Sequence, residues 1–200
     1  MRYVLLVAAM LATNVMASPV AEPGSSPASA LSGVEVQTGF SPGGTALRLV
    51  LDSIKGARHE VLVAAYSLTS RPVAGELRAA MERGVTVAVV ADRKANDNRY
   101  TAVNFLANNG VPVRINDRYE AMHNKFLVID RSILVTGSFN YSASADSRNA
   151  ENVVKISGVP DVASAYVNEF SRLWQESQDV APRYGSGRLI NRGHEVIQLD

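Results

Sequence analysis

Residues 123–140 have the sequence HNKFLVIDRSILVTGSFN, and this stretch decides the fold. Two mainly apolar runs, residues 126–129 and 133–136, flank a polar turn at residues 130–132. Apolar runs of this length on either side of a short polar turn are typical of a β-hairpin. The segment therefore predicts two antiparallel strands with polar residues gathered at their open end.

Strand-like and helix-like segments alternate along the rest of the chain. Residues 61–66 and 85–91 are apolar at almost every position, as in strands that are covered on both faces. The predicted strands are residues 34–40, 61–66, 85–91, 111–115, 126–129, 133–136 and 153–156, and the predicted helices are residues 45–55, 71–83, 101–109 and 162–174. Buried strands that alternate with helices predict an α/β sandwich around one mixed sheet.

The N-terminus has the features of a secretory signal peptide. Arg2 precedes a short apolar run, and small residues precede a cleavage point expected after Ala17. The alternative, a buried N-terminal helix, is disfavoured by the proline, glycine and serine residues that follow. The expected organisation is a signal peptide at 1–17, a flexible leader at 18–32, one domain at 33–175 and a polar tail at 176–200. We therefore expect a periplasmic or secreted protein without stable membrane insertion after cleavage.

The composition excludes several kinds of site. The 200 residues include no cysteine, which rules out disulfides, thiolate metal sites and cysteine nucleophiles. With only three histidines (His59, His123 and His194) we expect no metal centre and no cofactor. The 20 basic residues nearly match the 19 acidic ones, and loss of Arg2 with the signal peptide would balance them. Net charge therefore supplies no overall attraction for nucleic acid.

Four polar side chains are expected to meet at the open end of the hairpin. The register of the two strands sets His123 opposite Phe139. Alternate residues of a strand share a face, so His123 lies with Lys125, and Ser138 lies with Asn140. Phe139 then points into the core. An imidazole, an ammonium, a hydroxyl and an amide are thereby directed to one point.

This set of groups is suited to attack on a phosphate. Lys125 supplies positive charge, and Ser138 and Asn140 supply oriented donors for oxyanions. A neutral imidazole is a nucleophile near pH 7, so attack by His123 on phosphorus would give a phosphohistidine that water then hydrolyses. Glu151 is the nearby acid expected to accept the other ring N–H of His123.

Three more polar residues have weaker assignments. Asp130 lies in the turn, about 16 Å along the strand from Lys125, and is expected to be a turn and ion-pair residue. Arg93 and Arg99 follow a buried strand, at the end where open α/β sheets bind ligands. They are candidate contacts for substrate phosphates, and the alternative is a solvated loop.

The motif HxKxxxxD, followed after six residues by GSxN, resembles the HKD signature of the phospholipase D superfamily. The matching residues are His123, Lys125, Asp130, Gly137, Ser138 and Asn140, with Glu151 at the place of a downstream glutamate. The resemblance spans roughly residues 39–174 and is strongest to small, single-motif bacterial endonucleases of the Nuc type. It implies metal-independent phosphodiester hydrolysis through a covalent histidine, on a three-layer α/β/α sandwich with a central mixed sheet. It implies nothing about the tail.

A single copy of the motif predicts that two chains form one active site. One histidine must be neutral to attack, and a second must be protonated to give the leaving oxygen its proton. The chain has one HxK, so we expect a two-fold homodimer with both His123 side chains near the axis. The alternative is a monomer in which His59 or His194 acts as the acid.

The motif does not define the substrate. We expect a non-specific endonuclease that cleaves DNA, with RNA as a further candidate, by reading backbone phosphate. A phospholipase D-type lipid phosphodiesterase is the first alternative, although no amphipathic membrane-binding stretch follows the signal peptide. An inactive nucleic-acid-binding module is the second, although the intact set of His123, Lys125 and Asn140 is what catalysis demands.

Overall fold

A computed structural model describes residues 33–97 and 101–182 of the chain. The strands are β1 (Glu35–Ser41), β2 (Glu60–Ala65), β3 (Thr86–Asp92), β4 (Val113–Asn116), β5 (Lys125–Ile129), β6 (Ile133–Gly137), β7 (Glu151–Ser157) and β8 (Gln178–Asp179). The helices are α1 (Thr45–Gly56), α2 (Arg71–Glu82), the 3-10 turn η2 (Lys94–Asn96), α3 (Ala102–Asn108), α4 (Ala143–Ser147) and α5 (Pro160–Gln175). The expected signal peptide and leader, and most of the tail, lie outside the described residues.

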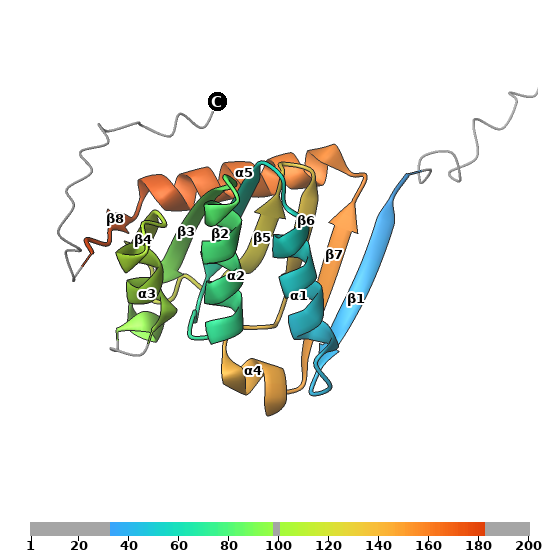
Figure 1. The fold of residues 1–200 in the computed structure, drawn as a ribbon, viewed down its shortest axis with the longest axis horizontal. Helices are drawn as coiled ribbons and strands as arrows, with labels where there is room; N and C mark the ends of the chain where they lie inside the picture. The colour runs from blue at the N-terminus through green and yellow to red at the C-terminus, as the bar shows by residue number, and fades with distance from the viewer. Residues whose placement is uncertain (1–32, 98–100, 183–200) are drawn as a thin grey trace, which may run out of the picture. The chain divides into compact units, whose positions relative to one another are not determined.

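The described strands form one mixed sheet in the order β1-β7-β6-β5-β2-β3-β4-β8. Strands β2, β3 and β4 are parallel to one another, and β5 is antiparallel to β2. Helices α1, α2 and α3 lie on one face, and α5 lies on the other (Figure 1). The predicted α/β/α sandwich with a central mixed sheet is therefore confirmed.

The hairpin at the centre of the sheet has the predicted register. Leu127 pairs with Val135, and Ile129 pairs with Ile133. The longer helices and strands all occur where the sequence predicts them, within two or three residues at each end. The elements without a prediction are η2, α4 and β8, which have between two and five residues and are too short to show a hydrophobic period.

Local sequence explains where the helices begin. The Ser70 hydroxyl accepts a hydrogen bond from the Val73 N–H at the start of α2, and Thr101 caps α3 through the Val103 N–H in the same way. Helix α1 starts after Gly44, whose φ of 75° is one that glycine adopts without strain. The Pro42-Gly43-Gly44 turn is therefore a helix entry.

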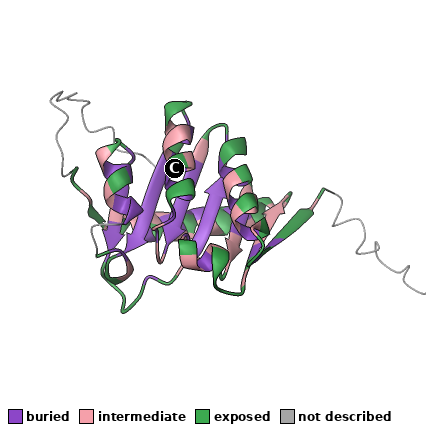
Figure 2. Cartoon of the chain, turned by 60° about the horizontal axis from the view of Figure 1, so that its bottom comes forward, coloured by how far each residue is buried: buried purple, intermediate pink, exposed green. Residues whose placement is uncertain are grey.

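Two apolar cores hold the layers together. One lies between the sheet and α1, α2 and α3, and the other lies between the sheet and α5. The central strands β2, β3 and β5 are buried over nearly their whole length, and most of edge strand β1 is exposed (Figure 2). Among the described residues, no helix is both long and apolar enough to span a bilayer.

Candidate active site

The sheet topology brings the motif residues other than Asp130 to one edge. Lys125 at the start of β5 pairs with Ala65 at the end of β2, because these strands are antiparallel. The end of β6 and the start of β7 lie at the same edge, since Gly137 pairs with Val153. This is the carboxyl edge of the parallel strands β2, β3 and β4, where open α/β sheets bind their ligands.

His123 and Lys125 are in direct contact at this edge. The Lys125 ammonium lies 2.9 Å from Nδ1 and 3.0 Å from Nε2 of His123, and it donates a hydrogen bond of 2.9 Å to the His123 carbonyl. Lys125 is only 9% exposed, whereas His123 is exposed. Burial lowers the pKa of Lys125, and the negative charge of Glu151 opposes that shift. The pair presents an accessible imidazole beside a fixed positive charge.

Tyr66 completes this part of the site, and sequence reasoning did not select it. Its ring lies 4.4 Å from that of His123 between centroids, and the Lys125 ammonium lies 5.0 Å from its centroid. The Tyr66 N–H also donates to the Asn124 carbonyl, at 2.8 Å. The available signal was its position directly after the buried strand β2. That signal is informative only once β2 is known to lie beside β5.

Ser138 and Glu151 form a second pair. The Ser138 hydroxyl donates to Glu151 at 2.5 Å, and the Asn149 amide donates to the other carboxylate oxygen at 2.8 Å. We expected the carboxylate to accept from His123, and in this chain it accepts from these two residues instead. The reason is strand order, because β7 lies beside β6, which leads to Ser138, and not beside β5.

Gly137 allows the chain to turn out of the sheet before Ser138. Its φ is 155°, and a Cβ at this position would lie 2.2 Å from the Asn152 carbonyl oxygen. A larger residue would therefore displace β7 from β6. The Ser138 N–H donates to that same carbonyl at 3.2 Å, which holds the turn against β7.

Asn140 follows this turn, at the same edge. The Phe139 side chain is 1% exposed and points into the core, as predicted. Within the described part of the chain, the Asn140 Oδ1 atom is buried without a hydrogen-bond partner. The Asn140 carbonyl accepts from the Ser142 N–H at 2.8 Å, so its backbone is fixed. The backbone bond of Asn140 and the burial of Phe139 thus hold Asn140 at the same edge of the sheet as Ser138.

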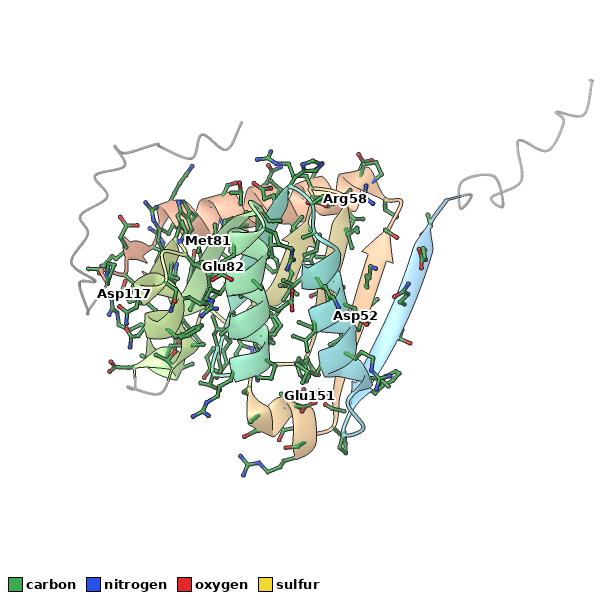
Figure 3. The ribbon with its side chains drawn as sticks, viewed as in Figure 1. Asp52, Arg58, Met81, Glu82, Asp117 and Glu151 are labelled. Carbon is green, nitrogen blue, oxygen red and sulfur yellow. The ribbon has the colours of Figure 1, made fainter. Side chains whose placement is uncertain are left out.

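Asp130 lies at the other end of β5 and takes no part in this cluster. Its carboxylate accepts hydrogen bonds from the backbone N–H groups of Arg58, His59 and Glu60, at 3.0, 2.7 and 2.9 Å. Burial acts to raise the pKa of Asp130, but these bonds outweigh it and hold the pKa below its ordinary value. The turn position is as predicted, while its partners are backbone amides and not a cation. Figure 3 shows Arg58 and Glu151 at opposite edges of the sheet.

The structure describes one of the two arginines that were predicted to contact substrate phosphates. Arg93 lies at the carboxyl end of β3, and its guanidinium bonds Asp117 at 3.0 Å and Gln178 at 3.1 Å. A phosphate contact by Arg93 would compete with these partners. Arg99 and His194 lie outside the described residues.

The fold and this edge together define an α/β enzyme that can hold a phosphate and attack it. The exposed imidazole of His123 is of the kind that can act as a nucleophile, and the Lys125 ammonium in contact with it is of the kind that can bind phosphoryl oxygens. Within the described residues no three His, Cys, Asp or Glu side chains are grouped to hold a metal ion.

The chain belongs to the phospholipase D superfamily and is a phosphodiesterase of that family. Residues 50–174 match the family described as cardiolipin synthase, PLD-like domain. The phospholipase D of Rickettsia bellii is 32% identical over 142 residues, which cover 71% of this chain and 70% of that protein. The mitochondrial cardiolipin hydrolase of Mus musculus is 26% identical over 150 residues, covering 75% of this chain and 66% of that protein. The crystal structure of Nuc from Salmonella typhimurium, a phospholipase D family member, has 35% identity and a TM-score of 0.73, covering 74% of this chain and 99% of Nuc.

Proposed function

We propose that this protein is a secreted or periplasmic endonuclease that cleaves nucleic-acid phosphodiester bonds without sequence preference. The observation that carries the proposal is the contact between His123 and Lys125, which places a nucleophile and a phosphate-binding charge within 3.0 Å. The proposal assigns recognition to backbone phosphate, which carries no sequence information and is the group that Lys125 can bind.

The reaction has two steps. In the first, a ring nitrogen of His123 attacks phosphorus, and the bond from phosphorus to the leaving oxygen breaks as that oxygen takes a proton from a second histidine. In the second, water attacks the phosphohistidine and gives its proton back to the second histidine, which releases His123 and the product phosphate. Lys125, Ser138 and Asn140 hold the non-bridging oxygens throughout.

The second histidine belongs to another copy of the chain in this proposal. His59, the other histidine that the structure describes, donates its backbone N–H to Asp130 at the opposite edge of the sheet. A two-fold axis beside the site would bring the second copy of His123 to the leaving oxygen. Localisation outside the cytoplasm rests on the expected signal peptide at residues 1–17.

A lipid phosphodiester is the second candidate substrate. Its support is that relatives of this chain are named phospholipase D and mitochondrial cardiolipin hydrolase. The nucleic-acid proposal rests on the resemblance to Nuc, whose whole length this chain nearly covers. In this proposal the cleavage of either substrate would use the same four residues, which are His123, Lys125, Ser138 and Asn140.

Cleavage of plasmid DNA by the mature protein in excess chelator tests the proposal. We expect nicking and then fragmentation by the wild type, and none by His123→Ala. His59→Ala is the matched control, because that residue lies at the far edge, and it should cut as the wild type does. Hydrolysis of cardiolipin vesicles without cutting of DNA or RNA would instead assign the lipid substrate. Equal cutting by His123→Ala would refute the nucleophile.

A further inference from the structure

A cavity lies between the first turns of α2 and α3, which are neighbours on the same face of the sheet (Figure 1). Its volume is about 320 Å³, at the small end of the range for sites that bind small molecules. The residues that line it come from the segments that lead into the two helices and from their first turns, and they are Thr69, Arg71, Ala74, Thr101, Ala102 and Phe105. The reaction proposed above uses none of these residues.

The cavity is connected to the edge of the sheet that carries His123, which we call the catalytic edge. The Thr69 N–H donates to the Tyr141 carbonyl at 2.8 Å, and Tyr141 directly follows Asn140. Tyr66, whose ring lies 4.4 Å from that of His123, is three residues before Thr69. Three residues span at most about 11 Å of chain. A strand with a phosphate at His123 is therefore long enough to place a neighbouring nucleotide at the cavity.

Arg71 supplies a positive charge at the rim of the cavity. Its side chain is exposed, and among the described residues its guanidinium has no hydrogen bond, ion pair or ring contact. The guanidinium of Arg93, by contrast, is bonded to Asp117 and Gln178. A guanidinium presents its N–H groups in a fork that matches phosphate oxygens. Arg71 is thus better placed than Arg93 to bind a phosphate next to the one that reacts.

Phe105 supplies an aromatic surface to the same cavity. Its side chain is 41% exposed, although it is large and apolar. The Arg78 guanidinium lies 6.0 Å from the centroid of this ring but does not line the cavity, so it supports the ring and leaves the cavity open. Proteins bind single strands by this combination, in which bases stack on aromatic rings and cations follow the backbone.

We propose that this cavity binds an unpaired nucleobase of the substrate strand, next to the bond that is cleaved, an inference that rests on the proposed function. The base stacks on Phe105, and Arg71 pairs with the phosphate that joins this nucleotide to the next. Every base has a face that can stack, so the contact adds affinity without sequence preference. An acyl chain fits this lining less well, because the lining includes a cation and two threonines.

Binding of two single strands to the His123→Ala protein tests the cavity without cleavage. One strand has about ten thymidines, and the other has the same length and charge with abasic sites in place of the bases. We expect the strand with bases to bind more tightly. Phe105→Leu should reduce that preference at least about fivefold, which is the effect of stacking one base. Phe105→Tyr keeps the ring and should retain the preference.

The role of Arg71 is measured with the same two strands. Arg71→Ala should weaken the binding of both strands equally, and it should lower the slope of log affinity against log salt concentration by about one. Arg58→Ala is the matched control, because Arg58 is also exposed but lies at the opposite edge of the sheet (Figure 3). It should change neither the affinities nor the slope.

Each outcome bears on one part of the proposal. If the wild type cuts DNA but Phe105→Leu leaves the preference for bases unchanged, the cavity is assigned wrongly and the proposed function stands. If the wild type cuts neither DNA nor RNA, the proposed function fails and this inference fails with it. If Phe105→Leu weakens binding to cardiolipin vesicles and not the preference for bases, the occupant is an acyl chain and the base is overturned. If Phe105→Leu is unfolded by circular dichroism, Phe105→Met is measured in its place.

Discussion

The Lys125 ammonium lies 2.9 Å from Nδ1 and 3.0 Å from Nε2 of His123. An ammonium has donors only, and this one also donates to the backbone carbonyl of His123. The contact therefore fixes the position of the imidazole beside a positive charge. In the proposed reaction Lys125 both positions the nucleophile and lies where the phosphate oxygens would bind.

Replacement of His123 should abolish turnover without affecting the fold. His123 is exposed and does not contribute to either core, so we expect His123→Ala to lower the cleavage rate by about 10³-fold or more with an unchanged melting temperature. Cleavage assays and thermal unfolding on the same preparation give both numbers. Residual activity above a tenth of the wild type would contradict the assignment.

Lys125→Ala should lower the rate by about 10²-fold or more, since it removes the charge that stabilises the phosphoryl oxygens. Lys55→Ala, at an exposed position on α1, is the control and should leave the rate unchanged. Steady-state rates against DNA concentration would separate the effect on turnover from that on binding. A loss confined to binding would show that Lys125 holds substrate without assisting the reaction.

Glu151→Gln should move the alkaline limit of activity. Burial lowers the pKa of Lys125 and the Glu151 carboxylate opposes this, so loss of the carboxylate lets the pKa fall further. Lys125 would then lose its proton at a lower pH, and the fall in rate at alkaline pH would shift toward neutrality. Ser138→Ala removes the hydrogen bond to Glu151 but no charge, and it should lower the rate without this shift. If the rate falls at the same alkaline pH in the wild type and in Glu151→Gln, the Glu151 charge has no effect on the titration of Lys125.

Asp130→Asn should destabilise the fold and spare the reacting groups. Asp130 joins the turn after β5 to three backbone N–H groups around the start of β2, and loss of its charge should cost about 2 kcal/mol of unfolding free energy at pH 7. Its folded-state pKa is lowered, so this stabilisation is present above the ordinary pKa and is lost as the pH falls through the folded value. Urea denaturation at pH 7 and pH 3 should show the difference between wild type and variant shrinking in acid. Asp52→Asn, exposed on α1 (Figure 3), is the control.

Mixing of subunits tests whether one site needs two chains. If wild type is refolded with a ninefold excess of His123→Ala, random pairing leaves about one tenth of the activity that the same wild-type amount has alone. A monomeric enzyme would keep all of it. Refolding with an excess of bovine albumin controls for dilution. His194→Ala, alone, would lose activity only if the acid came from the tail.

The sequence by itself determined the local features of this protein. Two apolar runs on either side of Asp130-Arg131-Ser132 leave a single register that buries both, so the pairing of Leu127 with Val135 was predictable. The motif residues from His123 to Asn140 all lie in that hairpin and in the residues that flank it, so the motif could be recognised in the sequence. The starts of α2 and α3 are also local features, because the Ser70 and Thr101 side chains bond N–H groups only two or three positions further along the chain.

The tertiary structure alone decided which distant segments meet. Tyr66 reaches His123 because β2 lies beside β5, and Glu151 bonds Ser138 because β7 lies beside β6. The partners of Asp130 and the exposure of Phe40 likewise depend on the order of strands and on where α5 ends over the sheet. Hydrophobic periodicity shows that a strand has a buried face, but it does not show which strand lies next to it, because any apolar neighbour satisfies the pattern.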